Sequence, residues 1–379
     1  MSFEVDPDAL DRFAALLGRY AEDATALKNH IQEKAAFANW SDWGLLLSQL
    51  APTHDLAVQV STERANLMWT IGTRSSSGVT EAASWYRSTD QESAADLDTT
   101  YAAVTPQETL DDRFTLNSYG MSGDELNRFA DRSEPTALLQ NPTVDWNSLA
   151  PDVNPIDTAF RNVTGVISGM NYVREFCKDT FGHDPFGIVA EFLAGDWQDF
   201  AKVAVVWHAC GDAVAGMAEN LRFSDESLAS VWSGNAADAA IDYFQQFHSA
   251  TQAEIKLYNL LYSNYCEYVK IACHAAQILN DTIDSIMDKV VTVLVAIAAG
   301  YSADGVLGAI FGGIVGAILE AIGFVVNVCT FALDAARLVQ IVESYSNLSY
   351  DIPPSELDAL SYVGGSSLPG YHHPASVGP

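Results

Sequence analysis

Two long segments, each with apolar residues at steps of three and four, flank the tripeptide Trp232-Ser233-Gly234. In the segment before it, the repeating residues are Leu193, Trp197, Phe200, Ala204, Trp207, Gly211, Val214, Ala218 and Leu221. In the segment after it, they are Phe244, Phe247, Tyr258, Leu261, Tyr265, Tyr268, Ala272, Ala275, Leu279 and Ile283. This spacing places one apolar stripe on each of two helices. It predicts a long antiparallel helical hairpin with Trp232 at its tip.

The residues of the turn favour a reversal of the chain. Glycine adopts positive φ readily, so we expect Gly234 to end the first helix. Asn235 suits the N-cap of the second helix, and Asp238 would lie near the positive end of that helix. Trp232 supplies a large apolar anchor at the bend.

Residues 1–100 repeat this organisation. Asp6 suits an N-cap and Pro7 suits the first position of a helix. The seam of that helix is Leu10, Phe13, Leu17, Tyr20, Ala24, Leu27 and Ile31. After an aromatic bend near Trp40 and Trp43, a second helix is predicted to run to about Leu97. One side of it carries Val60, Leu67, Ile71, Val79, Ala82 and Tyr86.

The rest of the chain divides by composition. Residues 101–155 form a proline-rich connector, and residues 156–288 contain the hairpin with Trp232. Residues 289–346 are apolar and rich in glycine, whereas residues 347–379 are rich in Pro, Gly and Ser and are expected to be disordered. The predicted fold class is all-α, an elongated bundle of two long antiparallel hairpins plus an apolar helical hairpin toward the C-terminus.

The apolar segment at 290–333 carries glycines at steps of three and four. These are Gly305, Gly308, Gly312 and Gly316. Small residues at this spacing let helices approach closely, in membranes or in tight bundles. One interpretation is a helix pair that inserts into a membrane or forms a homo-oligomer. Asp304 and Glu320 are costly in lipid and favour the other interpretation, a hairpin buried against the bundle.

The formal net charge is −30. Nucleic acid and anionic membrane surfaces are disfavoured as partners, because both require clustered Lys and Arg. A basic partner surface fits this charge better. The acidic segment 1–11 lacks the basic head and apolar run of a secretory signal peptide, so we expect none.

No catalytic, metal or cofactor motif stands out in the sequence. His208 with Cys210, and Cys273 with His274, lack metal-ligand spacing. The five cysteines are widely spread, and we interpret them as packing residues. We expect the pair His372 and His373 to lie in the disordered tail. These observations predict a protein that is not an enzyme and that needs neither metal nor cofactor.

The sequence Val-Trp-Ser-Gly-Asn-Ala-Ala-Asp-Ala at 231–239, between two amphipathic helices, resembles the W-x-G family of type VII (ESX) secretion substrates of actinobacteria. This resemblance covers about 186–286. The first hairpin looks like the small helical proteins secreted by the same systems. Its segment from Tyr86 to Asp90 fits their Y-x-x-x-D/E export motif. It departs from them in lacking a proper W-x-G, since the bend at 39–52 offers only Trp43-Gly44.

The resemblance implies that the two hairpins pair as an internal pseudo-heterodimer, a four-helix bundle. Trp232 and Tyr86 should then lie at the same end, within about 20 Å, less than two helix diameters. With Gly234 and Asp90 they would form a composite export signal, read by the secretion ATPase or a dedicated chaperone. The implied location is secreted or in the cell envelope. The alternative function is a membrane-inserting or pore-forming effector that uses 290–333.

Overall fold

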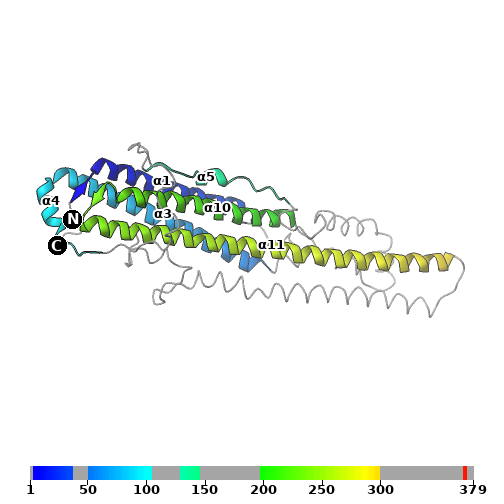
Figure 1. Ribbon diagram of the computed structural model, residues 1–379. Coiled ribbons are helices and arrows are strands. Elements are labelled where there is room, and N and C mark those ends of the chain that lie inside the picture. Colours follow the sequence, from blue (N-terminus) through cyan, green and yellow to red (C-terminus); the bar gives the residue numbers. More distant parts are fainter. Residues whose placement is uncertain (1–2, 37–49, 105–128, 146–196, 299–369, 374–379) are drawn as a thin grey trace, which may run out of the picture.

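The computed structural model describes residues 3–36, 50–104, 129–145, 197–298 and 370–373. Within these ranges the chain is almost entirely helical, and its strands are two residues long. The prediction of an all-α fold is therefore confirmed. Figure 1 shows the described helices as one elongated array, with the first and last described residues at the same end.

The first hairpin consists of α1 (Pro7–Lys34) and α3 (Ala51–Ser88), which lie side by side. Asp6 caps α1, because its Oδ1 accepts hydrogen bonds from the backbone N–H groups of Asp8 (3.0 Å) and Ala9 (3.1 Å). Pro7 occupies the first position, where no N–H is needed. All seven seam residues predicted for this helix are buried. The predicted start and apolar face of α1 are thus confirmed.

The second hairpin consists of α10 (Trp197–Leu228) and α11 (Asn235–Ala298). The predicted stripes are buried wherever their side chains are described, from Phe200 to Leu221 on α10 and from Phe244 to Tyr268 on α11. With 64 residues, α11 is about 96 Å long at a rise of 1.5 Å per residue. Its C-terminal half extends beyond the other described helices (Figure 1).

Large side chains join the two hairpins into one core. The ring of Phe13 on α1 meets the edge of Phe244 on α11, with centroids 4.7 Å apart. Two turns further along α1, Tyr20 packs against Phe247 and its Oη shares a 2.9 Å hydrogen bond with Thr251. Edge-to-face pairs of this kind add to the burial of apolar area. The contacts of α1 with both α3 and α10 complete a bundle of four long helices.

A buried ion pair also crosses between the hairpins. Arg64 on α3 faces Glu254 on α11, with 5% and 0% of their side chains exposed. The guanidinium Nε donates to Glu254 Oε2 at 3.2 Å, and a second nitrogen donates to Oε1. Such a bidentate pair is tolerated in a core because each charge satisfies the other. It fixes the register of α3 against α11.

The structure corrects the predicted end of the second helix. Instead of running to Leu97, α3 ends at Ser88, and a separate helix α4 (Gln91–Asp98) begins after it. Thr89 adopts an extended conformation, and Asp90 forms the N-cap of α4. Ser, Thr and Asp at 88–90 favour capping over helix interior, which explains the break.

Three short elements were not predicted. The strands β1 (Glu4–Val5) and β2 (Trp232–Ser233) form an antiparallel pair. Within the predicted connector 101–155, α5 (Pro135–Leu138) packs against α10. Of the apolar segment predicted at 289–346, residues 289–298 continue α11, and the rest lies outside the described residues. No helix in the described part of the chain is both long and apolar enough to cross a membrane.

We predict that Glu254→Gln lowers the free energy of unfolding by about 3–5 kcal/mol, because it leaves the Arg64 charge buried and uncompensated. Urea denaturation measures this change. The control is Asp199→Asn, in the half-exposed pair with Lys202, which should cost about 1 kcal/mol or less. Equal effects of the two substitutions would contradict the buried pairing.

Candidate functional site

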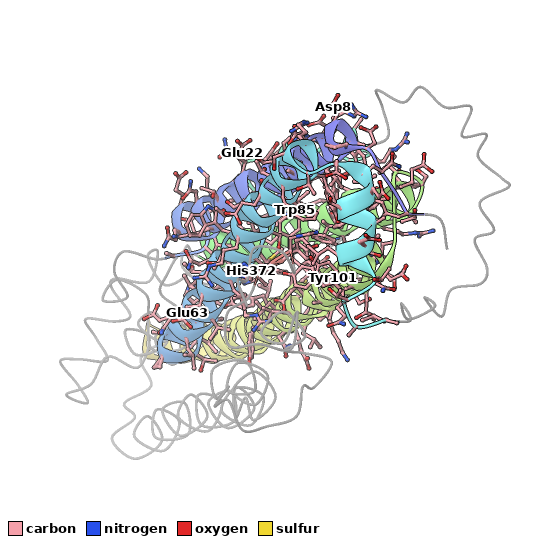
Figure 2. The ribbon with its side chains drawn as sticks, turned by 90° about the vertical axis from the view of Figure 1, so that its left-hand side faces the viewer. Asp8, Glu22, Glu63, Trp85, Tyr101 and His372 are labelled. Atoms are coloured by element: carbon pink, nitrogen blue, oxygen red, sulfur yellow. The ribbon has the colours of Figure 1, made fainter. Side chains whose placement is uncertain are left out.

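The turn that contains Trp232 is bound to the start of the first hairpin. In the strand pair, Val5 lies opposite Trp232 and Glu4 lies opposite Ser233. Next to it, the backbone N–H of Asp6 donates to the carbonyl of Val231 at 2.9 Å. The tip of the second hairpin therefore lies against the N-cap of α1, at the end of the bundle that faces the viewer in Figure 2.

Tyr86 lies beside Trp232 at this end. Their ring centroids are 5.9 Å apart in an edge-to-face arrangement, so the predicted proximity of the two residues is confirmed. Both are buried, with 6% of Tyr86 and 2% of Trp232 exposed. Phe3 and Trp85 also contact the Tyr86 ring. We call Tyr86, Trp85, Trp232, Tyr101 and His373 the aromatic tip.

Asp98, at the end of α4, caps α11 from the other hairpin. Its two carboxylate oxygens accept hydrogen bonds from the backbone N–H groups of Asn235 and Ala236, each at 2.8 Å. The side-chain amide of Asn235 donates in return to the carbonyls of Asp98 (3.0 Å) and Tyr101 (3.3 Å). The prediction that Asn235 is the N-cap is wrong. Asn235 is the first helical residue, and a carboxylate remote in sequence satisfies the helix end.

Glycine is required at position 234 for two reasons. Its φ is +132°, a conformation that other residues rarely adopt. A Cβ atom there would also lie 2.6 Å from Asp98 Oδ2. The predicted positive φ is confirmed, but Gly234 does not end α10, which stops at Leu228. Gly234 instead directs the chain into α11 and leaves room for the capping carboxylate.

The two residues of the predicted Tyr-x-x-x-Asp motif lie in different environments. In a helix running to Leu97, as predicted, Tyr86 and Asp90 would share one helix face. They do not, because α3 ends at Ser88 between them. Asp90 is exposed, and its carboxylate accepts from the backbone N–H (2.8 Å) and hydroxyl (2.7 Å) of Ser93. These hydrogen bonds lower the pKa of Asp90, so it is ionised at neutral pH.

A short segment near the C-terminus completes the aromatic tip. His373 stacks on Trp232, with centroids 5.9 Å apart and planes inclined by 22°, and its Nε2 shares a 2.9 Å hydrogen bond with Tyr86 Oη. Tyr371 packs against Trp232, Tyr243 and Phe244. The expectation of disorder over 347–379 is therefore wrong at 370–373. His372 between them is exposed (Figure 2).

Burial controls the ionisation of this cluster. It lowers the pKa of His373 to about 4, against a smaller opposing effect of the Asp98 carboxylate. It raises the pKa of Tyr86, and the adjacent Trp232 indole reduces that shift. Both groups are therefore uncharged at neutral pH. The tip is a packed, uncharged cluster with an ionised Asp90 at its surface, suited to recognition or to structural support.

The other candidate residues give no second site. Cys210 and Cys266 are buried free thiols, as expected for packing residues. His208 is a surface residue paired with Asp212. The described residues include no group of three or more His, Cys, Asp or Glu side chains placed to hold a metal ion. Gly305, Gly308, Gly312 and Gly316 lie outside the described residues.

Comparisons of the chain with protein-family models, with curated proteins and with solved structures found no match. The functional argument therefore depends on the residues of the tip and on their geometry.

We predict that Asp98→Ala lowers the free energy of unfolding by about 1–2 kcal/mol, the typical cost of a lost N-cap. Asp98→Asn should cost less, since its amide oxygen retains one acceptor. Thermal unfolding measures both. The control is Asp96→Ala, an exposed residue on the same short helix, which should be within about 0.5 kcal/mol of the unmodified protein. Equal stability of the Asp98→Ala and Asp96→Ala variants would contradict the capping role.

Proposed function

We propose that the protein is a non-enzymatic substrate of a type VII secretion system, exported in its folded state. The observation that supports this is the meeting of Trp232 and Tyr86 at one end of a single bundle, with ring centroids 5.9 Å apart. The two motifs resemble the two halves of the composite signal of that family. Here one chain supplies both halves.

The burial of the motif residues decides how such a signal would be read. A receptor cannot contact Tyr86 or Trp232 extensively, because 6% and 2% of them are exposed. These residues instead hold the surface of the tip in place. Asp90 is exposed and ionised, and it is the part of the motif that is available for direct contact.

Charge supports a basic receptor surface. The chain carries a net charge of −30, and the acidic residues near the tip include Asp8, Asp11 and Asp90. Arg87 lies between Asp8 and Asp11 and binds both, so it leaves the region acidic on balance. The secretion ATPase or a dedicated chaperone with a basic docking surface fits this arrangement.

We predict that Asp90→Asn abolishes or strongly reduces export while leaving the fold unchanged. Asn caps helices about as well as Asp, so α4 should persist, whereas the charge for the receptor is lost. A lost hydrogen bond to a charged group costs about 1.5–3 kcal/mol, which corresponds to about tenfold or more in receptor affinity. Secretion into the culture medium of a host with the export system measures the effect.

The matched control is Asp96→Ala, which removes an exposed carboxylate from the same helix and should be exported normally. Tyr86→Phe removes the Tyr86 hydroxyl but keeps the ring that packs on Trp232. This variant therefore tests the hydrogen bond of Tyr86 separately from its ring packing. Normal export of both Asp90→Asn and Asp90→Ala would contradict the proposed signal.

A further inference from the structure

The segment Gly370–His373 lies on the tip as a short peptide whose side chains alternate in environment. Tyr371 and His373 are buried, whereas His372 between them is exposed. This alternation is typical of an extended peptide that inserts every second side chain into its binding site. The segment contacts α3 of the first hairpin and both β2 and α11 of the second, so it bridges the two hairpins.

Both buried side chains have specific partners. The Tyr371 ring lies 5.3 Å from Phe244 and 5.7 Å from Tyr243, between centroids, and its backbone N–H donates to Ser75 Oγ at 3.1 Å. His373 stacks on Trp232 and shares a hydrogen bond with Tyr86. We call the residues that hold these two side chains the tail site: Ser75, Gly78, Tyr86, Trp232, Tyr243 and Phe244.

The backbone of the segment also fits α3 closely. A Cβ atom on Gly78 would lie 2.1 Å from the carbonyl oxygen of Tyr371, so only glycine permits this approach. Gly370 has φ +138°, and a Cβ atom there would lie 2.5 Å from Arg74 Cβ. Gly78 lies within a helix, where alanine is intrinsically preferred. Glycine at position 78 therefore allows the segment to dock, although it lowers the intrinsic stability of α3.

We propose that the tail site is a peptide-binding site for a Gly-Tyr-x-His segment, which the chain occupies with its own residues 370–373 and which a free peptide of the same sequence also binds. The bound segment covers the buried pair Tyr86 and Trp232, so its release changes the surface of the tip. This inference stands on the contacts of the segment and does not depend on export.

The test uses the full-length chain with Tyr371→Ala and His373→Ala, which vacates the tail site. A fluorescent peptide with the sequence of residues 369–374 should bind this variant at least tenfold more tightly than it binds the unmodified protein. In the unmodified protein the chain's own segment competes at an effective concentration in the millimolar range. Fluorescence anisotropy measures both affinities.

Two matched controls accompany this measurement. A peptide with Ala in place of Tyr371 should not bind the vacated variant. The protein variant His372→Ala, whose altered side chain is exposed, should bind the free peptide as weakly as the unmodified protein. Equal affinity of the peptide for the vacated and unmodified chains would overturn the proposal, and so would unfolding of the vacated variant, which would make the segment an integral part of the core.

A second variant tests the site independently. Gly78→Ala should displace the segment from the otherwise unmodified chain, so that the Tyr371 amide loses protection from hydrogen exchange while the four long helices keep theirs. Gly18→Ala on α1 is its control, because a Cβ atom there meets Ser76 Oγ at an ordinary 3.8 Å. Retained protection of Tyr371, or loss of protection throughout the bundle, in Gly78→Ala would contradict the proposal.

The affinity should also depend on pH. In the described part of the chain, the groups that face His373 include Tyr86 and Trp85 on α3, Trp232 on β2, and Asp98 and Tyr101 at and after the end of α4. Among these groups the Asp98 carboxylate adds negative charge, and burial outweighs it.

The pKa of His373 is about 4 when bound and should be near 6.5 in the free peptide, so protonation favours release as the pH falls. The peptide should bind about tenfold or more weakly at pH 5 than at pH 7. A peptide with Gln in place of His373 should lose this dependence. The same pH dependence for both peptides would contradict the role of His373.

Discussion

Each hairpin has one apolar stripe that it cannot bury alone, and the packing of these stripes against each other determines the rest of the structure. Phe13 and Tyr20 on α1 insert beside Phe244 and Phe247 on α11, and the Arg64–Glu254 pair fixes the register further along. A shift by one helical turn would separate the rings and leave two charges buried without partners. The register in turn places the Trp232 turn of the second hairpin beside the open end of the first, where α1 begins and α3 ends.

At that end each hairpin completes the local structure of the other. Asp98 in the first unit caps α11 in the second, and Trp232 pairs through β2 with Val5. Gly234 is required because the capping carboxylate approaches its Cα. The proximity of Tyr86 and Trp232 is thus a consequence of the fold. A composite signal built on it depends on the folded bundle, in keeping with the proposed export of folded protein.

The sequence was sufficient to predict features set by neighbours along the chain. Periodicity located the buried stripes, and Asp6 with Pro7 located the start of α1, because capping and helix phase are local. Asp98 and His373 were missed because their partners lie more than a hundred residues away. The break before Asp90 was locally readable from Ser, Thr and Asp at 88–90. Apolar periodicity alone does not reveal it.

The contact between Tyr86 and Trp232 tests the central claim most directly, because it exists only if the hairpins pack in this register. Nuclear Overhauser measurements on protein protonated only at aromatic side chains would detect it. The structure predicts cross-peaks from the Trp232 indole to the Tyr86 ring and to His373, since the centroids lie 5.9 Å apart in both pairs. A folded, helical protein without these cross-peaks, with Trp232 accessible to a fluorescence quencher, would contradict the shared tip.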